Sequence, residues 1–226
     1  MSKNYLLFFS ALFFSCQLAA QTKYIFEQQK MGSPFTITIY AGDSVKAATI
    51  AAQAFQLADS LNNILSDYID SSEINRLSAS SGKSLYVPVS PPLFDILKYA
   101  QSAAVLSNGA YDITVGPVVK LWRKARKTKI FPDKDSLTAA LQRTGYRYVH
   151  IDTLHRSVYL EKSGMQLDVG GLGKGFVVQA ALNLIKENGF GSAMVNAGGK
   201  GNGTTSNKNE PIKTNRYCHH ICIQIC

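Results

Sequence analysis

The hydrophobic period of the sequence changes abruptly at Ser44, and this change constrains the fold more than any other feature. Residues 34–40, PFTITIY, alternate apolar and polar side chains, which is typical of a half-buried β-strand. From Ser44, the expected N-cap, apolar residues recur at steps of three and four, which predicts a long helix reaching Leu65. Its buried stripe is expected to be Val45, Ala48, Ala52, Phe55, Ala58, Leu61 and Leu65.

Further helices and strands are expected downstream. A second helix should begin after Ser90, with Pro91 and Pro92 in its first turn and Gly109 beyond its end. Its predicted stripe is Leu93, Leu97, Ala100 and Ala104. Helices are also predicted near 136–144 and 174–188, and strands near 147–151, 157–161, 165–169 and 193–197. This order is not a regular βαβ alternation, so the predicted fold class is α+β, a single mixed domain.

The composition indicates a globular chain with a local excess of basic residues. Its 226 residues are 46% hydrophobic and 17% charged. The net charge of +9 comes from two segments, 120–134 with a net +6 and 200–226 with a net +3. A basic loop can meet acidic lipid, nucleic acid or an acidic partner, but a solvated basic face is favoured. Aromatic side chains are not interleaved with these charges, so we expect no nucleic-acid partner.

The N-terminus has the pattern of an export signal. Lys3 precedes the apolar run LLFFSALFF, which is too short to span a membrane as a mature helix. Cleavage after Ala20 would make residues 1–20 a signal peptide, whereas FFS-C offers a lipoprotein site at Cys16. Residues 17–217 contain no cysteine, so the exported body is expected to fold without disulfides.

The stretch LDVGGLGKGF (167–176) is the strongest local motif. Gly171, Gly173 and Gly175 are each two residues apart, which does not fit the G-x-G-x-x-G dinucleotide fingerprint. Lys174 is followed by glycine, so the hydroxyl of a P-loop is missing as well. Glycines and a helix N-terminus still suit a bound anion, with Lys174 adding a positive charge. A tight strand-to-helix turn without a ligand is the structural alternative.

The glycine motif is one of five blocks that occur in order. The blocks are KMGSPF (30–35), LSDYIDSSEINRLS (65–78), SNGAYDITVGPVVKLW (107–122), LDVGGLGKGF (167–176) and MVNAGG (194–199). Together they resemble the FAD:protein FMN transferases, also called the thiamine-biosynthesis lipoprotein (ApbE) family. The resemblance covers residues 24–199, which are therefore expected to form a flavin transferase domain.

The resemblance implies an activity, a location and partners. Members of the family are exported and often lipid-anchored, which would place this protein at the periplasmic face of the cell envelope. They split FAD, transfer its FMN half to a Thr or Ser hydroxyl of a redox-complex subunit, and release AMP. They require Mg²⁺, as expected where charge builds up on a phosphoryl group.

The resemblance also implies which residues bind the ligand. Those expected to contact FAD are Met31, Tyr68, Glu73, Ala110, Tyr111, Asp112, Asp168, Gly170, Lys174 and Phe176. Gly173 stands where the family usually has alanine, whose backbone carbonyl ligates Mg²⁺, and a glycine carbonyl can do the same. No catalytic residue is assigned.

Several of these residues have a structural alternative. Met31 and Tyr111 could be ordinary core residues, and Lys174 could lie at a solvated helix start. Asp112, just before ITV, could cap a turn. Trp122, at the end of the third block, is expected in the core.

The resemblance stops abruptly after Gly199. The family pattern continues with aspartate, where this chain has Lys200, and later supplies a histidine block and the carboxylate that completes the Mg²⁺ site. We expect residues 200–226 to be an aberrant, disordered tail, as an out-of-frame translation would produce. The cysteines of the tail follow C-x₃-C-x₃-C, which lacks the paired spacing of a zinc site.

Three interpretations follow from the sequence. The first is an envelope flavin transferase, incomplete in this copy. The second is an envelope lipoprotein that binds FAD without transferring it. The third is an envelope protein whose glycine turn is purely structural.

Overall fold

The fold is built on a four-stranded antiparallel sheet, as a computed structural model of residues 21–198 and 221–225 shows. Its strands are β1 (Thr22–Lys30), β2 (Ser33–Ala41), β6 (Ala193–Ala197) and β7 (Ile221–Ile225), in the order β1-β2-β6-β7. The expected strands 34–40 and 193–197 are therefore confirmed as β2 and β6, and β1 and β7 are additional strands. Strand β7 lies within residues 200–226, which were expected to form a disordered tail, and it pairs with β6. The expected signal segment, with Cys16, and residues 199–220 lie outside the described residues.

Strands β1 and β2 form a tight hairpin. Lys30 pairs with Ser33, so Met31 and Gly32 alone make the turn. Both have positive φ, 51° and 71°, which is the backbone that a two-residue type I′ turn requires. Glycine adopts this conformation freely, whereas methionine does so at a cost. The turn therefore fixes the position of the Met31 side chain at one end of the sheet.

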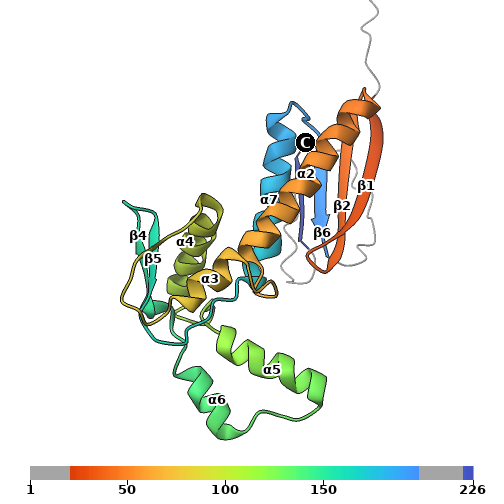
Figure 1. Cartoon of the computed structure of the whole chain (residues 1–226). Helices are drawn as coiled ribbons and strands as arrows, with labels where there is room; N and C mark the ends of the chain where they lie inside the picture. Colours follow the sequence, from red (N-terminus) through yellow and green to blue (C-terminus); the bar gives the residue numbers. More distant parts are fainter. Residues whose placement is uncertain (1–20, 199–220, 226) are drawn as a thin grey trace, which may run out of the picture.

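Helices α2 (Ser44–Leu65) and α7 (Gly170–Glu187) pack against the sheet and against each other (Figure 1). Phe35, Ile37 and Ile39 of β2 are fully buried in the common core. Small residues such as Ala54 and Ala181 are also fully buried, which allows close packing of backbones. The period change at Ser44 therefore marks the boundary between the sheet and its helical layer.

The beginning of α2 differs from the expectation in two ways. Asp43, not Ser44, is the N-cap, and its carboxylate accepts hydrogen bonds from the N–H groups of Val45 and Lys46 at 2.9 and 3.1 Å. The first half of the stripe was also wrong, because the residues buried there are Ala47, Ile50, Ala51 and Ala54. Alanines lie on several faces of this half, so hydrophobicity alone did not select one.

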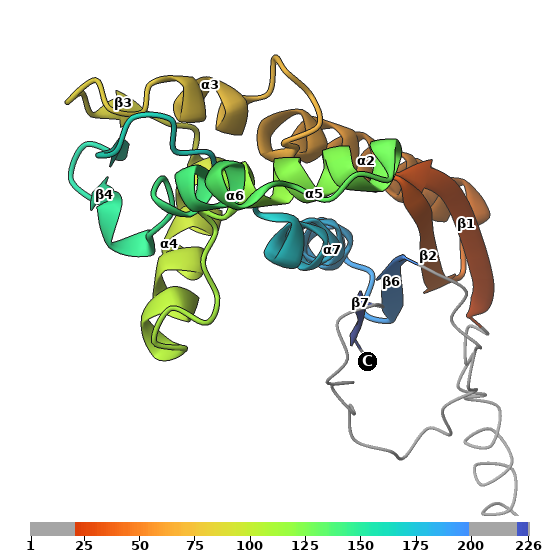
Figure 2. The same ribbon diagram turned by 90° about the horizontal axis from the view of Figure 1, so that it is seen from below.

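A second group of elements lies beside the main sheet. It contains α3 (Glu73–Ala79), α4 (Pro91–Leu106), a 3-10 turn (Tyr146–Tyr148) and the small sheet β3-β5-β4 (Val87–Pro88, Ser157–Leu160 and Val149–Asp152). Figure 2 shows this group on one side of the molecule and the main sheet on the other. The predicted stripe of α4 is confirmed, because all four of its residues are buried. The predicted strands near 147–151 and 157–161 correspond to β4 and β5.

Helices α5 (Gly116–Thr128) and α6 (Lys134–Leu141) project from the rest of the fold in Figure 1. In α5, only Gly116 and Pro117 are buried. Trp122 was expected in the core, but it is 43% exposed and contacts Phe131 edge-on, with ring centroids 6.0 Å apart. The prediction for Trp122 was wrong because only the first turn of α5 lies in the core.

The segment before α7 is not the expected strand. Residues 165–169 form no strand, and only Gln166 makes an isolated bridge, to Val115. Helix α7 begins at Gly170 instead of near residue 174, so the motif glycines lie inside its first turns. The architecture as a whole is mixed α+β, as expected. None of the helices in the described residues is long and apolar enough to cross a membrane.

Candidate functional site

The guanidinium of Arg123 joins three segments that are distant in sequence. It donates a hydrogen bond to Asp67, in the loop after α2, and its Nη2 lies 3.1 Å from Oδ2 of Asp168, just before α7. Its Cζ lies 4.0 Å from the ring centroid of Tyr68, a cation–π geometry. The side chain of Arg123 is 20% exposed and those of both aspartates are 11% exposed. We call Asp67, Tyr68, Arg123 and Asp168 the arginine cluster.

The arginine cluster has one positive charge facing two negative charges. Burial lowers the pKa of Arg123, but the hydrogen bond to Asp67 and the charges of Asp67, Tyr68 and Asp168 outweigh burial and raise it. Arg123 therefore stays charged over the whole physiological range.

Asp168 connects the arginine cluster to the first turn of α7. Its Oδ1 accepts a hydrogen bond from the Gly170 N–H at 2.7 Å, although the N-cap position itself belongs to Val169. A carboxylate here also interacts favourably with the positive end of the helix dipole. A β-carbon on Gly170 would lie 2.9 Å from Oδ1 of Asp168, so the glycine leaves room for this carboxylate.

Tyr111 lies against the same helix start. A β-carbon on Gly171 would lie 3.2 Å from Cε2 of its ring. Its hydroxyl is buried and has no hydrogen-bond partner among the described residues. Burial, then the charges of Asp168 and Asp112, raise the pKa of Tyr111 to about 12. The hydroxyl therefore keeps its proton at neutral pH and can donate a hydrogen bond to a ligand.

The β1–β2 hairpin approaches α7 one turn further on. Lys174 Nζ donates to Ser33 Oγ at 3.1 Å, which links α7 to the start of β2. Within the described ranges no carboxylate lies within 4.0 Å of this ammonium. The methyl carbon of Met31 lies 4.0 Å from the position that a β-carbon on Gly173 would take. The structure therefore brings Met31, Gly173 and Lys174 together at the end of the hairpin.

Glu73 and Asp112 are held by contacts within the chain. The two carboxylate oxygens of Glu73 each lie 2.6 Å from Ser90, one from its N–H and one from its hydroxyl. Asp112 Oδ1 accepts from the N–H and the hydroxyl of Thr114 at 2.8 and 2.6 Å, and Oδ2 accepts from the Tyr146 N–H at 2.8 Å. These contacts fit the turn-capping alternative for Asp112. Ligand contacts by both residues stay predictions.

Phe176 and Ala110 have other surroundings. The ring of Phe176 packs against Tyr99 of α4, with centroids 6.5 Å apart. Ala110 is exposed in the loop after α4. Neither residue has a described contact with the arginine cluster, so their expected role at the FAD site also stays a prediction.

The described residues do not by themselves form a magnesium site. Mg²⁺ favours six oxygen ligands, including carboxylates, in a near-octahedral arrangement. Among residues 21–198, no group of three or more His, Cys, Asp or Glu side chains is placed to hold a metal. The carbonyl of Gly173 would be a single ligand.

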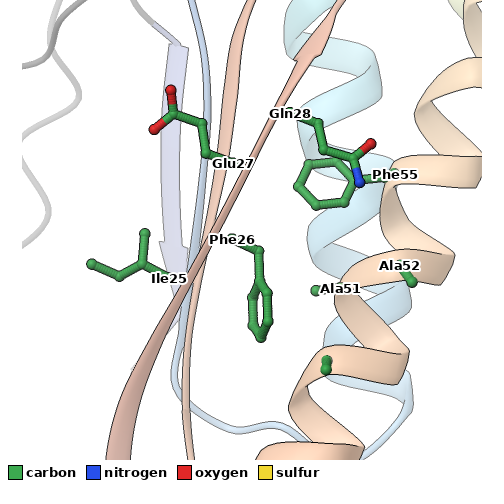
Figure 3. Close-up of a pocket in the computed structure, with 8 residues that line it drawn as sticks. Ile25, Phe26, Glu27, Gln28, Ala51, Ala52 and Phe55 are labelled. Carbon is green, nitrogen blue, oxygen red and sulfur yellow. The ribbon is translucent and has the colours of Figure 1, made fainter.

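A groove elsewhere in the structure is less suited to a charged ligand. It lies between β1 and the first half of α2, and is lined by Ile25, Phe26, Glu27, Gln28, Ala48, Ala51, Ala52 and Phe55. Figure 3 shows Phe26 and Gln28 on the side of α2, and Ile25 and Glu27 pointing away from it. The lining of this groove includes no Lys or Arg side chain that could bind a phosphate. We therefore place the candidate site at the arginine cluster.

Sequence reasoning missed Asp67 and Arg123. Asp67 lies within the second block, next to Tyr68, and Arg123 directly follows the third block. Arg123 was counted with the basic surplus of 120–134 and interpreted as part of a solvated face. A basic residue directly after a motif block was the available signal.

Comparison with known proteins agrees with this assembly of motifs. Residues 31–215 match the ApbE family, so the match extends beyond Gly199. An FAD:protein FMN transferase from Klebsiella pneumoniae is 28% identical over 176 residues, which are 78% of this chain and 54% of the relative. One from Treponema pallidum is 34% identical over 152 residues, covering 65% of this chain and 42% of the relative. The chain thus spans about half the length of these relatives.

Solved structures show the same fold. The flavin transferase ApbE from Vibrio cholerae superposes with a TM-score of 0.71 at 23% identity, over 80% of this chain and 60% of the other. The ApbE protein from Thermotoga maritima gives 0.69 at 23% identity, over 79% and 60%. The family match covers most of the chain and the fold agrees with it. The chain therefore belongs to the ApbE family.

Proposed function

We propose that this protein transfers FMN from FAD to a Thr or Ser hydroxyl of a target redox protein. In this reaction the hydroxyl oxygen bonds to the phosphorus of the FMN half, and the pyrophosphate P–O bond breaks. AMP leaves with the bridging oxygen, and the hydroxyl proton is released to solvent. The observation that carries the proposal is the family match over residues 31–215, which includes every segment of the arginine cluster.

The chemistry of the site supports binding of a flavin dinucleotide. Tyr68 is 74% exposed, although the Arg123 guanidinium lies over its ring. The exposed aromatic surface is available to stack against a flat ring system. The Tyr111 hydroxyl offers an unused hydrogen-bond donor. The Lys174 ammonium, beside the start of an 18-residue helix, suits a phosphate.

Magnesium dependence stays a prediction of the family resemblance. The Gly173 carbonyl is the one ligand that the family resemblance implies. We therefore assign no step of the reaction to a metal held by the described residues.

The proposal is tested first by FAD binding. The full chain is titrated with FAD, FMN and AMP while flavin fluorescence is followed, and AMP release is then measured with a Thr-containing acceptor protein and Mg²⁺. We expect FAD to bind more tightly than FMN or AMP alone, because both halves contribute contacts. We also expect AMP release to require the acceptor.

Matched variants locate the binding. Asp168→Asn keeps the side-chain shape but replaces a carboxylate oxygen by an NH₂ group, which cannot accept from the Gly170 N–H or from Arg123, and should weaken FAD binding by loosening the arginine cluster. Asp95→Asn makes the same change in an exposed ion pair with Lys98 on α4, and should leave binding unchanged. FAD bound without AMP release would support the binding-only interpretation. An absence of flavin binding would contradict the proposal.

We further propose that the protein is exported to the cell envelope, on the basis of the apolar run after Lys3. The two processing alternatives predict different products. Metabolic labelling with palmitate should mark the protein if Cys16 is lipidated, and Cys16→Ser should abolish the label. An unlabelled product that begins at Gln21 would support cleavage after Ala20 instead.

A further inference from the structure

We propose that Arg123 is a positioning residue of the flavin site, which holds the Tyr68 ring and the Asp168 carboxylate in the orientation that a bound flavin dinucleotide needs. This inference rests on the proposed function. Arg123 lies outside the five motif blocks, so the resemblance gave it no role.

The first argument is how the loop after α2 is held. Asn75 fixes its backbone, because Nδ2 donates to the carbonyls of Asp67 and Ile69 at 3.2 and 2.9 Å. The side chain of Tyr68 is 74% exposed, so little packing restrains its ring. Arg123 supplies the restraint, with Cζ 4.0 Å from the ring centroid. Backbone and ring of this loop are thus held by different residues, which can be varied separately.

The second argument is how the Asp168 carboxylate is oriented. The Gly170 N–H donates to one oxygen at 2.7 Å and Arg123 Nη2 donates to the other at 3.1 Å. Because both oxygens are held, the orientation of the carboxylate is fixed. A carboxylate oxygen can accept more than one hydrogen bond, so Asp168 keeps acceptor capacity for a ligand hydroxyl. Without Arg123, only one oxygen would be held.

The third argument is charge. Asp67 and Asp168 both face the same guanidinium, and both are largely buried. If Arg123 is removed, two carboxylates remain without their shared cation, and they would repel the pyrophosphate of an approaching FAD. Loss of Arg123 should therefore weaken FAD binding through both orientation and charge.

Lysine cannot fully replace arginine here. The planar guanidinium bonds two carboxylates with separate N–H groups and lies over the Tyr68 ring. An ammonium supplies the charge but not this fork geometry. The effect of Arg123→Lys should therefore be intermediate between wild type and Arg123→Met.

The test is a double-mutant cycle on FAD affinity. Wild type, Arg123→Met, Tyr68→Ala and the double variant are titrated with FAD, well below the melting temperature of each. Arg123→Met should raise the Kd about tenfold, the effect of removing a cation–π contact together with a charge pair. In the Tyr68→Ala background the same change should have a clearly smaller effect, because the ring that Arg123 orients is gone. Lys124→Met, at the next and exposed position of α5, should bind FAD as wild type does.

The outcomes separate the inference from the proposed function. Wild type that binds no FAD contradicts both. Wild type and Arg123→Met that bind FAD equally overturn the role of Arg123 alone. Strict additivity in the cycle overturns positioning through Tyr68. If Arg123→Met does not fold, Arg123→Lys decides: an unchanged Kd contradicts the inference, and an intermediate Kd that depends on Tyr68 supports it.

Discussion

A β-carbon on Gly116 would lie 2.5 Å from the backbone oxygen of Gln166, so the first turn of α5 is in close backbone contact with the segment that leads into α7. The same contact includes the parallel bridge between Val115 and Gln166 and a hydrogen bond from the Asp168 N–H to the Ile113 carbonyl at 2.7 Å. It sets the distance between the helix that carries Arg123 and the segment that carries Asp168. The geometry of the arginine cluster therefore depends on a glycine outside it.

Gly116→Ala should lower the free energy of unfolding by about 2 kcal/mol, because backbone atoms cannot move aside as a flexible side chain can. The loss should appear as a lower denaturant midpoint in urea unfolding followed by circular dichroism. If Arg123 and Asp168 are pushed apart, FAD affinity should also fall. A variant as stable as wild type would show that α5 shifts without cost.

Gly173→Ala should have the opposite effect, and it is the matched control. Gly173 lies inside α7, and its β-carbon would meet Val169 and Met31 at ordinary contact distances of 3.8 and 4.0 Å. Replacing a helical glycine by alanine then raises the free energy of unfolding by about 0.5–1 kcal/mol. The same urea titration checks this, and destabilisation by alanine would mean that the Met31 turn cannot accommodate a methyl group.

The sequence predicted the elements whose apolar pattern had only one interpretation. Strand β2 alternates strictly and α4 has one leucine-rich face, and both were found as expected. In the alanine-rich first half of α2, several faces are equally apolar, so the buried face is determined by the elements that pack against the helix. Trp122 shows the same limit, because the pattern of α5 does not say that the helix leaves the core.

The candidate site was predicted only where a motif marked it. The family blocks predicted Tyr68, Tyr111 and Asp168 as ligand-binding residues, and the structure places them at or beside the arginine cluster. Arg123 could not be distinguished from its neighbours by charge. What sets it apart is its contact with two largely buried carboxylates from other segments, and this is a property of the tertiary structure.

Asp112→Asn should destabilise the protein by about 2 kcal/mol at neutral pH. Oδ2 accepts from the Tyr146 N–H at 2.8 Å, and an amide nitrogen placed there would face another donor. If the amide turns over, the unfavourable contact moves to the Thr114 N–H at Oδ1. Thermal unfolding of Asp112→Asn beside Asp135→Asn, an exposed aspartate on α6, measures the difference. Equal stability would mean that Asp112 is free to serve a ligand.

Glu73→Ala should cost about 2–3 kcal/mol, because two charge-assisted hydrogen bonds to Ser90 are lost together. Ser90→Ala removes only the hydroxyl bond and should cost less. If Glu73 is purely structural, FAD affinity of the folded Glu73→Ala variant should equal that of wild type, as fluorescence titration can show. A weakened affinity at unchanged folding would instead support the ligand contact that the family pattern implies.

Tyr111→Phe should change how stability depends on alkaline pH. Burial and the nearby carboxylates raise the pKa of Tyr111 from 10.0 to about 12, so the unfolded chain loses this proton at lower pH than the folded one. The contribution of the protonated phenol is fully present below pH 10 and is lost as pH rises from about 10 to 12. The free energy of unfolding of wild type should therefore fall more steeply than that of Tyr111→Phe over this window, in urea titrations at pH 9, 10, 11 and 12. The difference between the two proteins isolates Tyr111 from other groups that titrate there, and parallel curves would show that its phenol is not shielded.

At neutral pH the free energy of unfolding of Tyr111→Phe should exceed that of wild type by about 1 kcal/mol, because the variant lacks an unpaired buried hydroxyl. Its FAD affinity should fall if that hydroxyl serves the ligand.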